Sequence, residues 1–302
     1  MQLAAPNIKM APIGLGTVQF GVDYGIGNVD GRTQPGEVSQ ILETARAHGI
    51  RMLDTAAQYG DSEAVLGDVL AGDEGFDIIT KTPPLDAGVP PADWLRQSLQ
   101  TSLRLLQRRR LYGLMLHRCD DLLSEQGHEL YETLRRIKAE GLVKKIGVSV
   151  YNPRQLDYVL EHFAVDLVQL PLNLLDQRMI AGGQLARLRA AGIEVHARSV
   201  FLQGLLLMKP KAAPDHFAPV RAHLQRLHDA CAEIHLSPHA AALNFVRTTE
   251  GINCAIVGVC STEQLNELLA ARIDAEQGLP EPEAHALQDE RVINPSQWPA
   301  HR

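Results

Sequence analysis

The stretch AEGLVKKIGVS at residues 139–149 joins the end of a helix to the beginning of a strand. Glycine tolerates the left-handed backbone in which many helices end, so Gly141 marks a helix end. The aliphatic residues that follow it predict a strand over residues 145–149. The same Ala-x-Gly-Ile/Leu pattern occurs at residues 47–50 and 190–193. The chain therefore repeats one helix-to-strand corner three times.

Short apolar runs alternate with amphipathic helical windows along almost the whole chain, as in proteins whose helices cover a parallel sheet. The residues Val38, Ile41, Leu42 and Ala45 illustrate the helical spacing, because they fall on one face of a helix. The predicted strands are residues 12–15, 51–54, 77–81, 112–117, 145–149, 167–170, 194–197 and 255–257. Their spacing from the second to the seventh averages roughly 28 residues, close to one βα unit.

Eight such units favour an α/β fold, a closed (β/α)8 TIM barrel in a single domain over residues 1–302. An open doubly wound sheet would normally carry G-x-G-x-x-G after its first strand. That turn instead reads GLGTVQFG at residues 14–21. The interval of about 198–254 is twice as long as the others and is expected to be an elaborated loop, and about 273–302 a C-terminal tail.

The composition is that of a folded globular protein and excludes several classes of function. The chain has 302 residues, 45% of them hydrophobic, and a net charge of −7, which disfavours binding to nucleic acid. Its four cysteines form no CxxC pair, so we expect reduced thiols and a cytoplasmic protein. No apolar run approaches the length of a membrane span, and no H-E-x-x-H or cysteine–histidine cluster predicts a metal site.

Ionisable residues end three neighbouring predicted strands, at the barrel rim where active sites of this fold lie. Asp54 ends the second strand, Lys81 the third and His117 the fourth, while Tyr59 lies in the loop after the second. An ammonium group beside a tyrosine favours its phenolate and makes the phenol a better proton donor. Lys81 would supply that group, Asp54 would orient Lys81, and His117 would donate a hydrogen bond to a substrate oxygen. Tyr59 is therefore the predicted acid of a carbonyl-reducing site.

With these residues the sequence resembles the aldo-keto reductase family over about residues 10–272. The matching motifs occur in family order: GLGT at 14–17, LDTAAQYG at 53–60, Lys81, LMLH at 114–117, IGVS at 146–149 and IVG at 256–258. The resemblance implies an NAD(P)H-dependent oxidoreductase that reduces an aldehyde or ketone to an alcohol, or catalyses the reverse. It implies the same four catalytic residues, with Tyr59 as the proton donor and a small carbonyl or alcohol as the substrate.

The resemblance also implies a cofactor site. The expected cofactor-binding residues are Gly16, Thr17, Ser149, Gln169, Arg198, Ser199, Gly204, Gly258, Ser261 and Gln264. The helix that begins at Ser261 is expected to offer free backbone amides to a phosphate. The loop after the first strand, with Phe20 and Tyr24, is expected to line the substrate pocket.

Three positions depart from the family pattern. Val150 replaces an asparagine that is common after the serine of strand five, and Arg198 replaces an aromatic ring. A guanidinium group can stack on a flat ring or bind an anionic group of a substrate. No Lys or Arg lies between Gly258 and Gln264, where relatives commonly bind the 2′-phosphate of NADP. NADPH is the cofactor that the family implies, and NADH stays open.

Two other functions also stay open. The first is a barrel aldolase or lyase in which Lys81 forms a Schiff base with its substrate. The second is a non-catalytic regulatory subunit that binds nicotinamide and resembles the β-subunits of potassium channels. Borohydride trapping on Lys81 would support the first, and tight cofactor binding without turnover would support the second.

Overall fold

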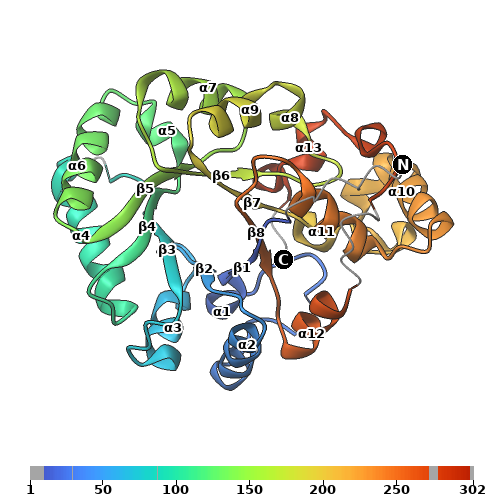
Figure 1. Ribbon diagram of the computed structural model, residues 1–302, viewed down its shortest axis with the longest axis horizontal. Coiled ribbons are helices and arrows are strands. Elements are labelled where there is room, and N and C mark those ends of the chain that lie inside the picture. Colours follow the sequence, from blue (N-terminus) through green and yellow to red (C-terminus); the bar gives the residue numbers. More distant parts are fainter. Residues whose placement is uncertain (1–9, 29, 87, 272–277, 300–302) are drawn as a thin grey trace, which may run out of the picture.

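Eight parallel strands close into a barrel in this computed structural model, which describes residues 10–28, 30–86, 88–271 and 278–299 (Figure 1). Each strand pairs with its neighbours in sequence, and β1 pairs with β8 to close the sheet. The strands are β1 (Ile13–Gly16), β2 (Met52–Asp54), β3 (Asp77–Lys81), β4 (Leu111–Leu116), β5 (Val143–Ser149), β6 (Leu167–Pro171), β7 (Glu194–Arg198) and β8 (Cys254–Gly258). The predicted (β/α)8 TIM barrel is confirmed.

Helices surround the barrel and bury one face against it (Figure 1). The longer ones are α2 (Pro35–Ala47), α3 (Ser62–Leu70), α4 (Pro91–Leu105), α6 (Gly127–Ala139), α7 (Pro153–His162), α9 (Gln184–Ala190), α10 (Arg221–Glu233), α11 (Pro238–Thr248) and α12 (Thr262–Ala270). The four apolar residues predicted to share a face of α2 are all buried. Within the described ranges, no helix combines the length and apolar character needed to cross a membrane.

The repeated helix-to-strand corner has the backbone that its glycines predict. Gly49, Gly141 and Gly192 have φ angles of 77°, 77° and 68°, in the left-handed region where a side chain would be strained. At the opposite end of a helix, the Asn152 side chain accepts a hydrogen bond from the backbone N–H of Gln155 and caps α7. These local signals explain why the predicted strands agree with the observed ones to within two residues.

The connection between β7 and β8 contains α10, α11 and three short 3-10 helices. Its apolar side chains build a second hydrophobic cluster, separate from the barrel core. The cluster consists of Leu174, Leu175, Leu202, Leu205, Leu206, Ala213, Phe217, Leu224, Leu227, Cys231, Leu236, Ala240, Ala241, Ala242, Leu279, Val292 and Ile293. The last residues come from the predicted tail, which includes α13 (Glu290–Ile293), while 272–277 and 300–302 lie outside the described residues.

The interior of the barrel positions polar side chains at the carboxyl ends of the strands. Ile79, Met115 and Leu167 pack together inside the barrel. Side chains alternate along a strand, so the residues two positions further on, Lys81, His117 and Gln169, share the inward direction. The strand pattern therefore gathers one polar layer above an apolar one.

Candidate active site

The structure brings the predicted catalytic residues together. The Lys81 ammonium group donates to Asp54 Oδ2 at 2.6 Å, to the Thr55 carbonyl at 3.1 Å and to the Tyr59 hydroxyl at 3.4 Å. The Tyr59 and His117 rings meet edge to face, with their centroids 5.7 Å apart. Asp54, Tyr59, Lys81 and His117 therefore form one cluster at the barrel rim.

Tight turns and close backbone packing hold Tyr59 in this cluster. Its N–H donates to the Ala56 carbonyl and its carbonyl accepts from the Ser62 N–H, each at 3.0 Å. Gly21, at the end of the short helix α1 (Val18–Gly21), packs against the Tyr59 carbonyl so closely that a Cβ atom there would overlap it. The loop that carries the phenol is thus fixed by α1 on one side and by α3 on the other.

The Lys81 side chain is fully buried and all of its contacts are taken by the protein. Its exposed fraction is 0%, and that of Asp54 is 5%. Burial lowers the pKa of Lys81, and the Asp54 charge opposes that shift. With three acceptors around its nitrogen, Lys81 offers no approach to a substrate carbonyl, which disfavours the Schiff-base alternative.

Tyr59 is held in its protonated form. Burial and the Asp54 charge raise its pKa, and the opposing Arg198 charge does not overcome them. Desolvation therefore outweighs the nearby positive charge in this state of the protein, and the Tyr59 phenol stays protonated. A protonated phenol is the form that donates a proton during a reduction.

His117 is a neutral imidazole at the edge of the same cluster. Burial, with the charges of Lys81 and Arg198, lowers its pKa to about 3. Its Nδ1 atom is buried and has no hydrogen-bond partner among the described residues. A buried polar atom without a partner is costly, so it marks a place where a polar ligand atom binds.

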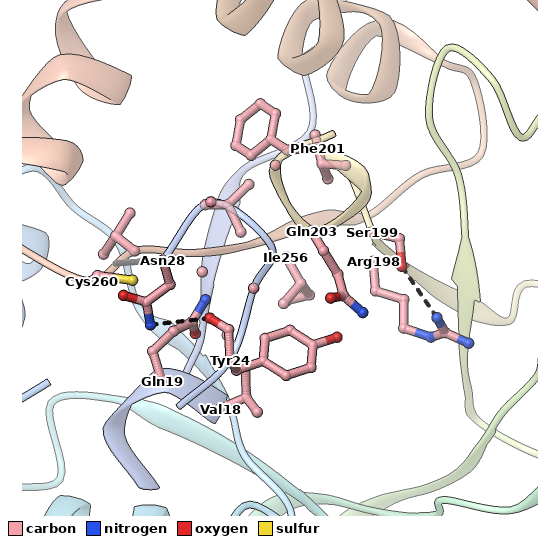
Figure 2. A pocket seen from close by; sticks show the side chains of 18 of the residues that line it. Val18, Gln19, Tyr24, Asn28, Arg198, Ser199, Phe201, Gln203, Ile256 and Cys260 are labelled. Carbon is pink, nitrogen blue, oxygen red and sulfur yellow. Dashed lines mark hydrogen bonds between the residues drawn. The ribbon is translucent and has the colours of Figure 1, made fainter. Parts of the chain in front are cut away.

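A cavity of about 690 Å³ extends from this cluster to β8 and α12. In Figure 2 the Tyr24 hydroxyl points toward Gln203, and Arg198 lies beyond Gln203; all three residues line the cavity. The predicted site residues that line the cavity are Gly16, Thr17, Tyr24, Asp54, Tyr59, His117, Gln169, Arg198, Ser199, Gly204, Gly258 and Gln264.

Four predicted site residues do not line the cavity. Lys81 lies behind Tyr59 and Asp54, and Ser149 is buried within β5, paired in register with Gln169. Phe20 is fully buried in the barrel core, so the expectation that it lines the substrate pocket is wrong. The reason is that residues 18–21 form the helix α1, which buries the Phe20 ring.

The fourth, Ser261, caps α12 by accepting a hydrogen bond from the Gln264 N–H. The Glu37 carboxylate accepts from the Thr262 N–H at 2.5 Å, and the Gln264 side chain accepts from the Cys260 N–H at 2.8 Å. The amides of Thr262 and Gln264 in the first turn of α12, and that of Cys260 just before it, are therefore not free, because the protein's own side chains occupy them.

Gln169 is bound to the catalytic cluster from the far side. Its side-chain amide donates to Asp54 Oδ1 at 2.8 Å, while Asp54 Oδ2 accepts from Lys81. Both oxygens of the buried Asp54 carboxylate are thus satisfied. Gln169 therefore positions Asp54 as well as lining the cavity.

Sequence reasoning missed several residues of the cavity. Gln19 lies against Gly258, where a Cβ atom would come within 2.5 Å of the Gln19 amide nitrogen. The Gln19 Oε1 atom is buried and has no partner in the described ranges. Tyr151 stacks under Arg198, and Gln203 lies beside Tyr24. Gln19 belongs to the quoted 14–21 turn, but its burial depends on β8, which is more than 230 residues away in the sequence.

Comparisons with known proteins agree with this geometry. A family model described as Aldo/keto reductase family matches residues 12–278. A pyridoxal 4-dehydrogenase from Microbacterium luteolum is 25% identical over 97% of both chains, and a 6-dehydroglucose reductase from Novosphingobium aromaticivorans is 31% identical over 54% of both chains. The solved structure of an aldo-keto reductase from Bacillus halodurans, in its holo form, covers 98% of both chains with a TM-score of 0.73 and 19% identity.

The family model covers most of the chain, and the likeness to the Bacillus halodurans structure extends the agreement to the whole fold. The chain belongs to the aldo/keto reductase family and is an NAD(P)H-dependent oxidoreductase.

Proposed function

We propose that the enzyme reduces a small, polar aldehyde or ketone, or oxidises the corresponding alcohol, with Tyr59 as the proton donor or acceptor. The observation that carries this proposal is the contact of the buried Lys81 with both Asp54 and the Tyr59 hydroxyl at the cavity. This arrangement places a protonated phenol beside a buried cation, where a carbonyl oxygen that gains negative charge requires a proton.

The cavity residues fit a nicotinamide dinucleotide. The cavity has a volume of about 690 Å³, and two of the residues that line it, Gln19 and His117, each have a buried polar atom without a partner among the described residues. Ser199, Gly204, Gly258 and Gln264 line the part that leads away from Tyr59 and would hold the remainder of the molecule. A bound nicotinamide supplies the hydride that the carbonyl carbon receives.

The residues of the cluster then have separate roles. Tyr59 gives its phenolic proton to the substrate oxygen, and the nearby Lys81 charge stabilises the phenolate that is left. Asp54, held by Gln169, keeps Lys81 in place. His117, being neutral, donates a hydrogen bond to the same substrate oxygen without competing for its proton. In the oxidative direction Tyr59 accepts the proton instead.

NADPH is the proposed cofactor, with NADH as the alternative. Of the described residues that line the cavity, Arg198 is the single Lys or Arg, and it lies near the catalytic cluster. The part near α12 contains Cys260, Gln264 and Glu267, which give a 2′-phosphate no cation. Fluorescence titrations with NADPH and NADH in parallel decide between the two. We also propose a cytoplasmic enzyme, in keeping with its four free cysteines.

The test is the variant Tyr59→Phe, which removes only the phenolic oxygen. We expect turnover of a small aldehyde to fall about 100- to 10,000-fold, the range in which a general acid contributes. Cofactor affinity, followed by the fluorescence of the reduced nicotinamide, should change less than about twofold, because the phenolic oxygen acts in proton transfer and not in holding the cofactor. Tyr158→Phe is the matched control, since Tyr158 lies on α7 against His162.

Full turnover by Tyr59→Phe would refute the role of Tyr59. Tight cofactor binding by the wild-type protein without turnover of any carbonyl compound would instead favour the regulatory subunit.

A further inference from the structure

We propose that Arg198 binds an anionic group of the substrate, a carboxylate or a phosphate, and so selects charged carbonyl compounds. This inference rests on the proposed function and names the substrate class of the same site. It is carried by the position of Arg198, by its fixed orientation and by its lack of a negatively charged partner among the residues that the structure describes.

Arg198 is the last residue of β7 and lines the cavity. One terminal nitrogen donates to Ser199 Oγ at 3.2 Å, and the other donates to the Val150 carbonyl at 3.0 Å. The guanidinium carbon lies 4.2 Å from the centre of the Tyr151 ring, which supports the group from one side. These three contacts hold the guanidinium group in one orientation.

The charge of Arg198 is not balanced within the described part of the chain. None of the ion pairs found there includes Arg198, and its partners are a hydroxyl, a carbonyl and an aromatic ring. Its Nε atom is buried, with no hydrogen-bond partner among the described residues. Arg178, by contrast, binds the carboxylates of Asp176 and Glu290. Arg198 is only partly buried, but its guanidinium group lies against the cavity without an anion among the described residues, so a negatively charged ligand in the cavity would complete its contacts.

The Asp54 carboxylate in the catalytic cluster already has hydrogen-bond partners other than Arg198. Both oxygens of Asp54 accept hydrogen bonds, one from Lys81 and one from Gln169. His117 is neutral and adds no charge to this end of the cavity. Asp54 thus offsets the charge of Lys81, and the positive charge of Arg198 remains.

Arg198 is also close enough to the catalytic cluster to act on a small substrate. Its charge influences Tyr59, Lys81 and His117, as well as Tyr24 on the opposite side of the cavity (Figure 2). A guanidinium group has five N–H donors, and the contacts above use two of them. Its free donors can bind two oxygens of a carboxylate or phosphate side by side. An anion held there would keep the carbonyl of the same molecule near the Tyr59 hydroxyl.

The experiment compares pairs of substrates that differ in charge. The carboxylate pair is 4-formylbenzoate and its methyl ester, and the phosphate pair is glyceraldehyde 3-phosphate and glyceraldehyde. We expect the wild-type enzyme to prefer the anionic member of at least one pair. The pair in which this preference occurs shows whether the recognised group is a carboxylate or a phosphate. In Arg198→Gln, kcat/KM for that anionic member should fall about 10- to 100-fold, mainly through KM, as expected for a lost hydrogen-bonded charge. The neutral member should change less than about threefold.

Two further variants separate the role of Arg198 from the effect of net charge. Arg198→Lys keeps the positive charge but lacks the planar guanidinium group, and it should recover part of the preference for anionic substrates. Arg135→Gln makes the same change of net charge on the exposed surface of α6, where Arg135 pairs with Glu132, and should behave as the wild type.

An equal loss for both members of each pair, or a parallel loss of cofactor affinity in Arg198→Gln, would show that Arg198 serves the cofactor and would overturn the inference. A wild-type protein that reduces none of the four compounds contradicts the proposed function instead. In that case calorimetry measures the affinities for 4-formylbenzoate and for its ester in the presence of oxidised cofactor, which tests the inference without turnover. Stronger binding of the carboxylate supports it, and equal binding overturns it.

Discussion

His117 is a residue whose protonation couples the active site to the stability of the fold. Its pKa is lowered to about 3 in the folded protein, largely by burial, whereas an unfolded histidine titrates near 6.5. Between these pH values the unfolded chain binds one more proton at this position, so acid favours unfolding. We expect His117 to reduce the free energy of unfolding by about 2 kcal/mol between pH 7 and pH 5.

Urea unfolding of the wild type and of His117→Gln at both pH values measures this contribution. Glutamine cannot be protonated, so the wild type should lose about 2 kcal/mol more than the variant on acidification. His128→Gln, on the exposed surface of α6, is the control and should follow the wild type. Equal losses in all three proteins would mean that His117 is accessible to protons in the folded state.

At the scale of elements, the contact between α1 and the loop of Tyr59 sets the position of the catalytic phenol. A Cβ atom on Gly21 would overlap the Tyr59 carbonyl and lie 2.5 Å from the Ser62 N–H. We expect Gly21→Ala to cost about 1–3 kcal/mol of stability, the usual range for overpacking. Displacement of Tyr59 should lower kcat about 10- to 100-fold, since misplacement near 1 Å has effects of that size.

Thermal unfolding and steady-state kinetics of the same preparations test this. Gly36→Ala is the matched control, because Gly36 lies in the first turn of α2 and has no neighbouring atom within 4 Å of an added Cβ. The control should keep full activity and near-unchanged stability. Normal kcat in Gly21→Ala would show that the loop adapts and that α1 does not position Tyr59.

The elements were predictable because their signals are local. A glycine after a helix, a proline after Asn152 and an apolar run each act within a few residues, and the catalytic rim follows from the ends of the runs. Contacts across the closed barrel were not predictable in this way. Glu37 binds the Thr262 amide of α12 from 225 residues away, and Gln19 is buried against Gly258 only once β1 and β8 pair.

At the scale of the whole molecule, two hydrophobic clusters meet at the cavity. Leu202, Leu205 and Leu206 belong to the second cluster, and Ser199 and Gly204 beside them line the cavity. The second cluster is packed from α10, α11, α13, short 3-10 helices and loops outside the barrel, and such a peripheral unit opens more readily than barrel strands. Cofactor binding should therefore stabilise this cluster as a unit, in addition to the residues that touch the cofactor.

Hydrogen exchange followed by mass spectrometry tests this coupling. Some segments have to open before they can exchange, and their opening abolishes cofactor binding. With NADPH at 100 times its dissociation constant, the free energy of opening such a segment rises by about 2.7 kcal/mol, which slows its exchange about 100-fold. We expect this slowing in α10, which lies in the second cluster but does not line the cavity, and not in the surface amides of α6, which packs on the barrel far from the site. Slowing confined to residues 199–208 would show that the two clusters open independently. Slowing in α10 would show that cofactor binding and folding of the β7–β8 connection are coupled, because this connection would then have to be folded for the cofactor to bind.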